Sequence, residues 1–270
     1  MSIDLRDFES GLPYAGDYEA DLERLERRLA RVQAAFITRG ARALIIFEGW
    51  SASGKAGLIR RLTRCWDPRW YDAWRVADPN ILEQGHHFLW RFWQKLPAHG
   101  EIRILDGSWY GRVVSDRVSG RRDAGACARA YDEINEFEAQ QRDSGTLIIK
   151  IFLHVTEKEQ EMRFRARLKK PWKRWMISAS DLSSRGQRAS YLDAYADMFE
   201  QCHTRWAPWT VIDGTHKKAA RMRCLSVVAE HLEGWVDMSP PSLDPDVEAV
   251  AIRMLGTAPF FDNYVPAGSG

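Results

Sequence analysis

Ala43-Leu44-Ile45-Ile46-Phe47, then Glu48, then Gly49-Trp50-Ser51-Ala52-Ser53-Gly54-Lys55-Ala56-Gly57 is the stretch that decides the fold. The apolar run is typical of a buried strand, and the pattern Gly-x4-Gly-Lys is typical of a phosphate-binding loop that leads into a helix. Its glycines let backbone N–H groups turn toward a phosphate, its lysine reaches the outer phosphates, and the helix presents its positive end. The alternative is a plain glycine turn before a helix near Leu58. Because strand, loop and helix are predicted in this order, we favour phosphate binding.

The composition is that of an ordinary globular chain. Its 270 residues can form one large α/β domain with appendages, and a net charge of +2 is too small to predict nucleic-acid binding by itself. The four cysteines form no Cys-x-x-Cys pair, which favours reduced thiols in the cytoplasm. The apolar run at 147–155 is too short to span a bilayer, and the chain opens without a signal-peptide pattern. We therefore expect a cytoplasmic protein with no membrane partner.

Strand-like segments alternate with helical patterns along the chain. The segments are 43–47, 73–76, 102–105, 146–153 and 209–212. This alternation predicts the α/β class, with a parallel sheet covered by helices on both faces. Ligands in such folds bind at the carboxyl ends of the strands, where Lys55 and Asp106 fall.

Three regions are expected. Residues 1–40 form an N-terminal helical arm, with an amphipathic helix over 17–38 that packs beside the domain. Residues 41–235 form the main domain, in which the charged, helical segment 157–192 resembles a lid. Residues 236–270 form a C-terminal linker, a short helix and a tail.

Asp106 directly follows the apolar strand 102–105. In P-loop enzymes an aspartate at this position holds magnesium, so Asp106 is the first metal candidate. The alternative is a helix N-cap, and one aspartate can serve both purposes. Asp116 could face the same site only if the intervening segment is helical.

The segment 163–175 interleaves basic side chains with aromatic ones. Such a segment can neutralise a phosphate chain, and it could also bind RNA by charge and stacking. The alternative is a solvated helix face whose charges pair with the glutamates at 157–161. Since the same chain has a phosphate loop, we favour phosphate binding and consider nucleic acid unlikely.

Taken together, these motifs resemble those of the type-2 polyphosphate kinases, P-loop enzymes that move a terminal phosphate between inorganic polyphosphate and a nucleotide. The resemblance covers about residues 41–232. It rests on these matches in family order: Phe47-Glu48-Gly49-Trp50 with Gly54-Lys55, Leu89-Trp90-Arg91-Phe92-Trp93, Leu96-Pro97, Ser108-Trp109-Tyr110-Gly111-Arg112, Pro171-Trp172-Lys173-Arg174-Trp175 and Ala207-Pro208-Trp209-Thr210.

The resemblance implies a three-layer α/β/α sandwich with a parallel sheet of the P-loop kinase type and a helical lid. It implies catalytic roles for Lys55, Asp106 and Arg112. The residues that would bind phosphate and nucleotide are Gly49, Ser51, Ala52, Ser53, Gly54, Lys55, Ala56, Gly57, Arg91, Arg167, Lys173 and Arg174. The residues that would organise Mg²⁺, with Mn²⁺ as the second candidate, are Asp106, Asp116 and Ser51. The implied partners are inorganic polyphosphate, a purine nucleotide and further copies of the chain in a homo-oligomer.

Three positions depart from the family pattern. Ser51 stands where the family usually has aspartate, Gly107 where it usually has arginine, and Ala56 where it normally has glycine. The first change removes a carboxylate near the metal, and the second removes a cation that would meet developing charge. Each such loss can lower a phosphoryl-transfer rate by roughly a hundredfold to a thousandfold. We therefore expect a polyphosphate-dependent nucleotide kinase, with a catalytically impaired polyphosphate-binding or regulatory protein as the alternative.

Overall fold

The computed structural model describes residues 3–255 and divides the chain into two compact units, Met1–Met238 and Ser239–Gly270. The second unit contains helix α11 (Pro245–Leu255), whose first turn carries Asp246 and Glu248. The expected tail, from residue 256 on, lies outside the described residues. Among the helices of residues 3–255, none combines the length and the apolar character needed to cross a membrane.

Five parallel strands form one sheet in the order β2-β3-β1-β4-β5. Their bounds are β1 (Arg42–Gly49), β2 (Tyr71–Arg75), β3 (Ile102–Asp106), β4 (Thr146–His154) and β5 (Trp209–Asp213). Every predicted strand segment therefore falls on an observed strand. Since β1 lies between β3 and β4, the chain leaves it toward both edges of the sheet. The loop after β1 thus lies where ligands bind in open α/β sheets.

Helices connect the strands and continue beyond them. The α-helices of the first unit are α1 (Tyr18–Arg39), α2 (Lys55–Leu62), α3 (Ile81–Gln84), α4 (Trp90–Trp93), α5 (Ser115–Val118), α6 (Ala124–Asp143), α7 (Glu157–Lys169), α8 (Ala179–Gly186), α9 (Arg188–Cys202) and α10 (Lys217–Glu233). The 3-10 helices are η1 (Leu5–Phe8), η2 (Thr63–Cys65), η3 (Trp109–Arg112) and η4 (Pro171–Met176). The segment 157–192 is helical apart from short connections, as its charged pattern predicted.

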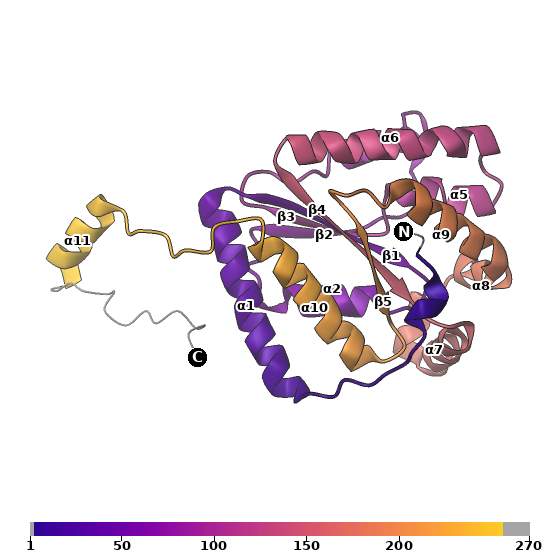
Figure 1. Ribbon diagram of the computed structural model, residues 1–270, viewed down its shortest axis with the longest axis horizontal. Coiled ribbons are helices and arrows are strands. Elements are labelled where there is room, and N and C mark those ends of the chain that lie inside the picture. Colours follow the sequence, from indigo (N-terminus) through magenta and orange to yellow (C-terminus); the bar gives the residue numbers. More distant parts are fainter. Residues whose placement is uncertain (1–2, 256–270) are drawn as a thin grey trace. The chain divides into compact units, whose positions relative to one another are not determined.

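Two apolar cores separate the sheet from its covering helices, so the expected three-layer α/β/α sandwich is confirmed. On one face, α6 and α9 pack against side chains such as Leu44 and Phe152. On the other face, α1, α2 and α10 pack against Ile45 and Ile151. Figure 1 shows α6 and α9 on one side of the strands and α1 and α10 on the other.

Helix α1 is part of the second core. Asp17 caps its N-terminus by accepting a hydrogen bond from the backbone N–H of Ala20, and Gly40 ends it in the left-handed conformation. Leu29, Val32 and Phe36 are fully buried in the core that also contains residues of α10. The apolar stripe of the predicted 17–38 helix thus faces the sheet layer.

Candidate functional site

The loop between β1 and α2 has a backbone that its glycines make possible. Gly49 and Gly54 both have a φ of 120°, and Ala52 has a φ of 63°. A Cβ atom at Gly49 would lie 2.1 Å from the carbonyl oxygen of Leu153, on the neighbouring strand β4. Only glycine allows this approach, so Gly49 is required for the loop to start beside β4.

Lys55 folds back over this loop. Its Nζ donates hydrogen bonds to the carbonyl oxygens of Gly49 at 2.8 Å and Trp50 at 3.3 Å. Lys55 is also the first residue of α2, so the ammonium and the positive end of the helix act in the same region. This arrangement agrees with the phosphate-binding interpretation of the sequence, although its role in catalysis stays a prediction.

Arg163 of α7 holds the outer side of the loop. Its guanidinium donates to the carbonyl oxygens of Ala52 at 3.1 Å and Ser53 at 2.5 Å, and to that of Gly214 at 2.6 Å. Because Arg163 takes up these loop carbonyls, the loop N–H groups are left to face the other way. The sequence reasoning noticed Arg163 only as one member of a basic segment.

Glu48 and Asp106 lie at the carboxyl ends of adjacent strands, where Phe47 pairs with Asp106 in the sheet register. The Glu48 carboxylate accepts a hydrogen bond of 2.6 Å from the hydroxyl of Ser108. Burial and, more weakly, the charge of Asp106 raise the pKa of Glu48, whereas Ser108 and Lys55 lower it. Sequence reasoning assigned no role to Glu48, whose position before Gly49 was the signal for one.

Arg112 and Asp116 lie together because the segment between them is helical, as their joint role required. Arg112 Nη1 is 3.7 Å from Asp116 Oδ2, and its guanidinium lies 5.1 Å from the centre of the Phe88 ring. Arg121 also lies 3.4 Å from Asp116. Asp116 thus has two cationic neighbours, and its role as a metal ligand stays a prediction.

The donor set suits a hard cation only in part. Within residues 3–255, His, Cys, Asp and Glu side chains nowhere gather in a group of three or more that could hold a metal ion. Mg²⁺ is commonly bound through one or two carboxylates together with substrate phosphates and water. Asp106, beside Glu48 and the phosphate loop, fits such a role, in which Mg²⁺ would bridge to a bound phosphate chain.

A basic pocket of about 310 Å³ lies between α2, α7 and α10, beside the phosphate loop. Its lining contains the loop residues Ala52, Ser53 and Gly54. Its cationic lining residues are Arg60, Arg163, Arg167, Lys170, Lys173, Lys217 and Arg221, and none of the described lining residues is acidic. The structure thus brings Arg167 and Lys173 to the loop, as predicted.

Two observations show that this pocket is short of negative charge. Burial lowers the pKa of Lys217, and the nearby charges of Arg163, Lys173 and Arg221 lower it further, against a raising contribution from Glu159. The Ser53 hydroxyl is buried and has no hydrogen-bond partner among the described residues. A bound anion would relieve the repulsion among the cations and supply an acceptor for this hydroxyl.

Two other predicted phosphate ligands have protein partners. Arg91 donates to the carbonyl oxygen of Ala77 at 2.9 Å, and its guanidinium lies 5.0 Å from the centre of the Trp74 ring. Arg174 donates to the carbonyl oxygen of Leu168 at 2.9 Å and is absent from the lining of the basic pocket. Both assignments stay predictions.

A buried ion pair anchors η3, the segment that carries Arg112. Lys150 Nζ lies 2.8 Å from Glu138 Oε2, and both side chains are fully buried. Glu138 accepts hydrogen bonds from Trp109 Nε1 and the Tyr110 hydroxyl, and Lys150 donates to Tyr110. Lys150, which interrupts the apolar run of β4, therefore fixes the start of the Arg112 segment.

The comparisons with known proteins agree with this geometry. Polyphosphate kinase 2 of Arthrobacter aurescens TC1 superposes with a TM-score of 0.84 at 31% sequence identity, covering 93% of this chain and 91% of that one. Residues 14–238 match the family model for polyphosphate kinase 2 (PPK2). The chain belongs to the PPK2 family. Its α/β fold and five-stranded parallel sheet are therefore those expected from the sequence.

Curated members of the PPK2 family are similar over most of this chain. The polyphosphate:AMP phosphotransferase of Pseudomonas syringae pv. tomato is 38% identical over 217 residues, which are 80% of this chain and 44% of that protein. The ADP-polyphosphate phosphotransferase 3 of Rhizobium meliloti is 36% identical over 211 residues, which are 78% and 74% of the two chains. The chain thus spans less than half the length of the first of these relatives.

Proposed function

We propose that this PPK2 chain is a polyphosphate-dependent nucleotide kinase. It transfers a terminal phosphate between inorganic polyphosphate and a nucleoside mono- or diphosphate. The observation that supports this most directly is the basic pocket, because its cations continue directly from the phosphate loop. A single phosphate needs few of them, whereas a phosphate chain carries a negative charge on each unit and can engage many.

In this proposal the two substrates approach the loop from different sides. Polyphosphate lies in the basic pocket with its end at the loop, beside Lys55. Neither Asp106 nor Arg112 lines that pocket. We assign these two residues to the side from which the nucleotide arrives.

The chemistry needs no protein nucleophile. An oxygen of the nucleotide phosphate attacks the terminal phosphorus of polyphosphate in line with the bridging oxygen; the new P–O bond forms as the bridging P–O bond breaks, and the shortened chain leaves. Lys55 and Arg112 stabilise the charge on the transferred group. Mg²⁺ held at Asp106 would supply further positive charge between the phosphates. Mn²⁺ is the second candidate.

The second candidate function is polyphosphate binding without turnover. The residues that favour it are Ser51 and Gly107, which leave the loop and the end of β3 without the carboxylate and the cation usual in the family. The basic pocket would then serve to hold polyphosphate alone. Binding in both cases is salt-sensitive, so only product formation separates them.

The working state we propose follows the family. We infer a homo-oligomer in the cytoplasm, with a purine nucleotide as the second substrate. The free state of Cys65, Cys127, Cys202 and Cys224 supports a reducing compartment.

The test is nucleotide formation by the purified chain. Polyphosphate and Mg²⁺ or Mn²⁺ are mixed with AMP, ADP, GMP or GDP in turn, and products are separated by chromatography. We expect phosphorylation of at least one acceptor. Absence of product with all four, together with tight polyphosphate binding, would reject the kinase and establish the binding protein.

A further inference from the structure

The N-terminal segment of residues 3–11 lies outside the part of the chain that matches the PPK2 family, which begins at residue 14. We call this segment the N-terminal strap. Leu5 anchors it by burying its side chain in the core that contains α9, and Ile3 and Phe8 pack against the same core. Figure 1 shows this indigo segment running past the end of β5 near α7.

The strap is tied to the carboxyl ends of two strands. At the end of β5, Asp213 accepts hydrogen bonds from the backbone N–H of Gly11 at 2.7 Å and from the Ser10 hydroxyl at 3.2 Å. At the end of β4, His154 Nε2 lies 2.9 Å from Glu9 Oε1. These strand ends flank the phosphate loop, so the strap borders the site without belonging to the loop.

His154 connects the strap to the loop. Trp50 Nε1 donates a hydrogen bond of 2.9 Å to His154 Nδ1, although the two residues are 104 positions apart. Because the indole nitrogen can only donate, Nδ1 must carry no proton, and Nε2 must therefore be the protonated nitrogen that donates to Glu9. Glu9 thus selects the histidine tautomer that can accept from Trp50.

Trp50 is the loop residue that this chain of contacts reaches. Its side chain is nearly completely buried, with Tyr195 edge-on at 5.0 Å and the Arg188 guanidinium 4.0 Å from the ring centre. Its carbonyl oxygen, and that of Gly49 before it, accept the hydrogen bonds from Lys55 Nζ. Any rotation of Trp50 would therefore move the acceptors that hold the lysine.

We propose that Glu9 is a positioning residue of the phosphate loop, acting through His154 on Trp50 and so on the placement of Lys55. The effect on phosphate binding rests on the proposed function, whereas the effect on Trp50 does not. Glu9 touches no loop atom itself.

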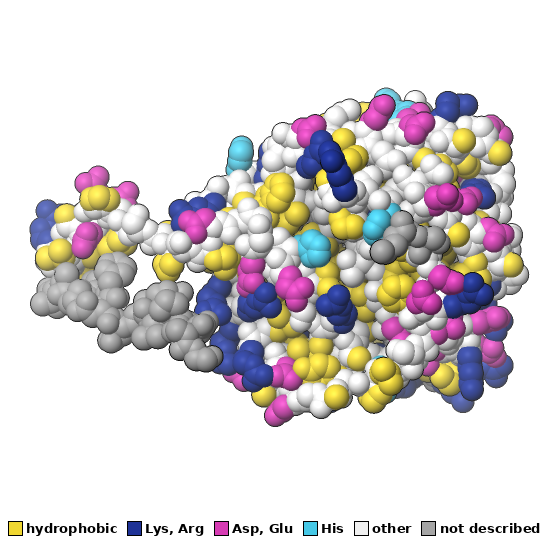
Figure 2. All heavy atoms as spheres, viewed as in Figure 1, with side chains coloured by type: hydrophobic (Ala, Val, Ile, Leu, Met, Phe, Trp, Pro, Cys, Tyr) yellow, Lys and Arg dark blue, Asp and Glu magenta, His cyan; other side chains and the backbone are white. Residues whose placement is uncertain are grey.

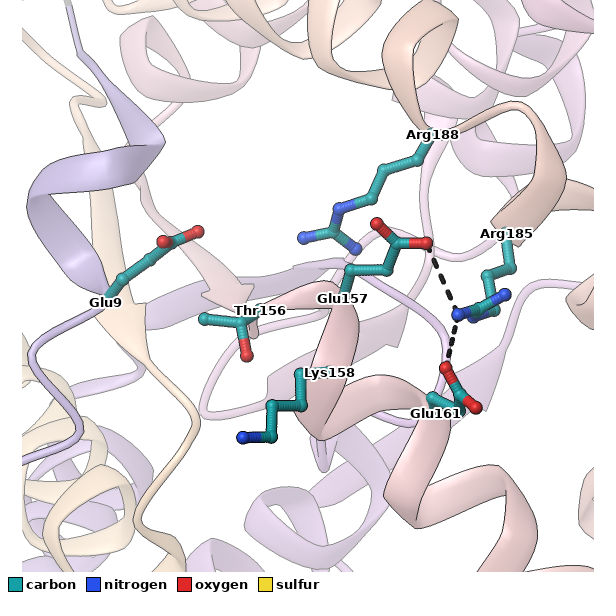
Figure 3. A pocket seen from close by; sticks show the side chains of 7 residues that line it. All are labelled: Glu9, Thr156, Glu157, Lys158, Glu161, Arg185 and Arg188. Carbon is teal, nitrogen blue, oxygen red and sulfur yellow. Dashed lines mark hydrogen bonds and ion pairs between the residues drawn. The ribbon is translucent and has the colours of Figure 1, made fainter.

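Glu9 is accessible to substitution without disturbance of the core. Figure 3 shows it reaching into an open pocket of about 490 Å³ from the strap, across from Arg188, with Thr156 and Lys158 at the start of α7 between them. Its side chain is 38% exposed, whereas that of His154 is 1% exposed. Replacing Glu9 thus removes the acceptor of His154 while the apolar anchor Leu5 remains.

The test compares three variants of the full chain. Glu9→Ala removes the acceptor, Glu9→Gln keeps an oxygen acceptor, and Asp7→Ala removes a charge from exposed η1 as the matched control. The first readout is the indole Nε1–H resonance of Trp50 in ¹⁵N-correlated NMR spectra, assigned by its loss in Trp50→Phe. The second is the affinity for fluorescently labelled polyphosphate, measured by anisotropy.

We expect Glu9→Ala alone to shift the Trp50 indole resonance and to weaken polyphosphate binding about threefold to tenfold, with Glu9→Gln restoring both. An unmoved Trp50 resonance in Glu9→Ala would overturn the proposal, and so would equal shifts in Glu9→Ala and Asp7→Ala. If the parent chain binds no polyphosphate, the proposed function fails, and the indole resonance still decides whether Glu9 positions the loop.

Discussion

The Ser51 hydroxyl, on the phosphate loop, donates a hydrogen bond of 2.5 Å to the Asp181 carboxylate on α8. Asp181 opens that helix in a capping box with Ser178, so its carboxylate is held in place by the lid segment. Although burial opposes it, hydrogen bonds from Ser51 and Ser178 lower the pKa of Asp181, which keeps it charged at neutral pH. The loop therefore contacts a carboxylate even though position 51 carries none.

The Ser51–Asp181 contact makes a prediction for Ser51→Asp, the change that restores the family residue. It would place two carboxylates within hydrogen-bond distance, and we expect their repulsion to loosen α8 from the loop. Limited proteolysis within 170–187 should become faster in Ser51→Asp. Adding Asp181→Asn should return the rate to that of the parent. Equal cleavage of parent and Ser51→Asp would show that α8 does not depend on this contact.

Restoring the family arginine at position 107 should cost stability. Gly107 has a φ of 80°, a region that side-chain-bearing residues rarely adopt, although its nearest neighbour, Val76, would leave room for a Cβ. We expect Gly107→Arg to lower the free energy of unfolding by about 1–2 kcal/mol, measured by urea denaturation. Gly186→Arg is the matched control, because Gly186 has open space and no such φ. A cost as small as that of the control would contradict the backbone argument.

The basic pocket predicts different effects for two adjacent cations. Lys173 lines the pocket, whereas Arg174 donates to the carbonyl oxygen of Leu168. Lys173→Ala should weaken polyphosphate binding and reduce the slope of log affinity against log salt by about 0.7, the value per phosphate contact for single-stranded nucleic acids. Arg174→Ala should leave the slope unchanged. Identical slopes for the two variants would reject the pocket as the polyphosphate site.

His154 predicts a dependence of stability on pH. Burial lowers its pKa below the ordinary 6.5, and Arg188 adds to this, while Glu9 and Asp213 act in the opposite direction. The unfolded chain therefore binds a proton more readily than the folded chain, so stability is full above about pH 6.5 and falls as the pH decreases toward the lowered pKa.

The measurement is urea denaturation between pH 7.5 and 5, with His154→Gln as the comparison. Glutamine can accept from Trp50 and donate to Glu9 without titrating. We expect the parent to lose more stability than His154→Gln over this range. Parallel losses would mean that His154 contributes nothing to acid sensitivity.

The sequence predicted the features that local pattern controls. The apolar run 43–47 and the glycines at 49 and 54 specified strand, loop and helix, and the charged pattern of 157–192 specified helices. Interactions across long sequence separations were not predictable. Ser53 and Arg163 are 110 positions apart, and Ser51 and Asp181 are 130 apart. Nothing in the spacing of a basic segment indicates which arginine will turn inward to hold loop carbonyls.

Position 9 illustrates the same limit for the candidate site. Glu9 lies 145 residues from His154, in a segment without a phosphate motif or a strong apolar pattern. Its contact with His154 depends on how η1 packs beside the ends of β4 and β5. Only the folded sheet brings these groups together.

The most direct test of the central claim is nucleotide formation from polyphosphate by the parent chain and by Lys55→Ala, with Lys158→Ala as an exposed-lysine control. Lys55 alone of these two lysines is hydrogen-bonded within the phosphate loop. The account predicts turnover in the parent and in Lys158→Ala, and a loss of at least about a hundredfold in Lys55→Ala. Equal turnover in Lys55→Ala and the parent would contradict it.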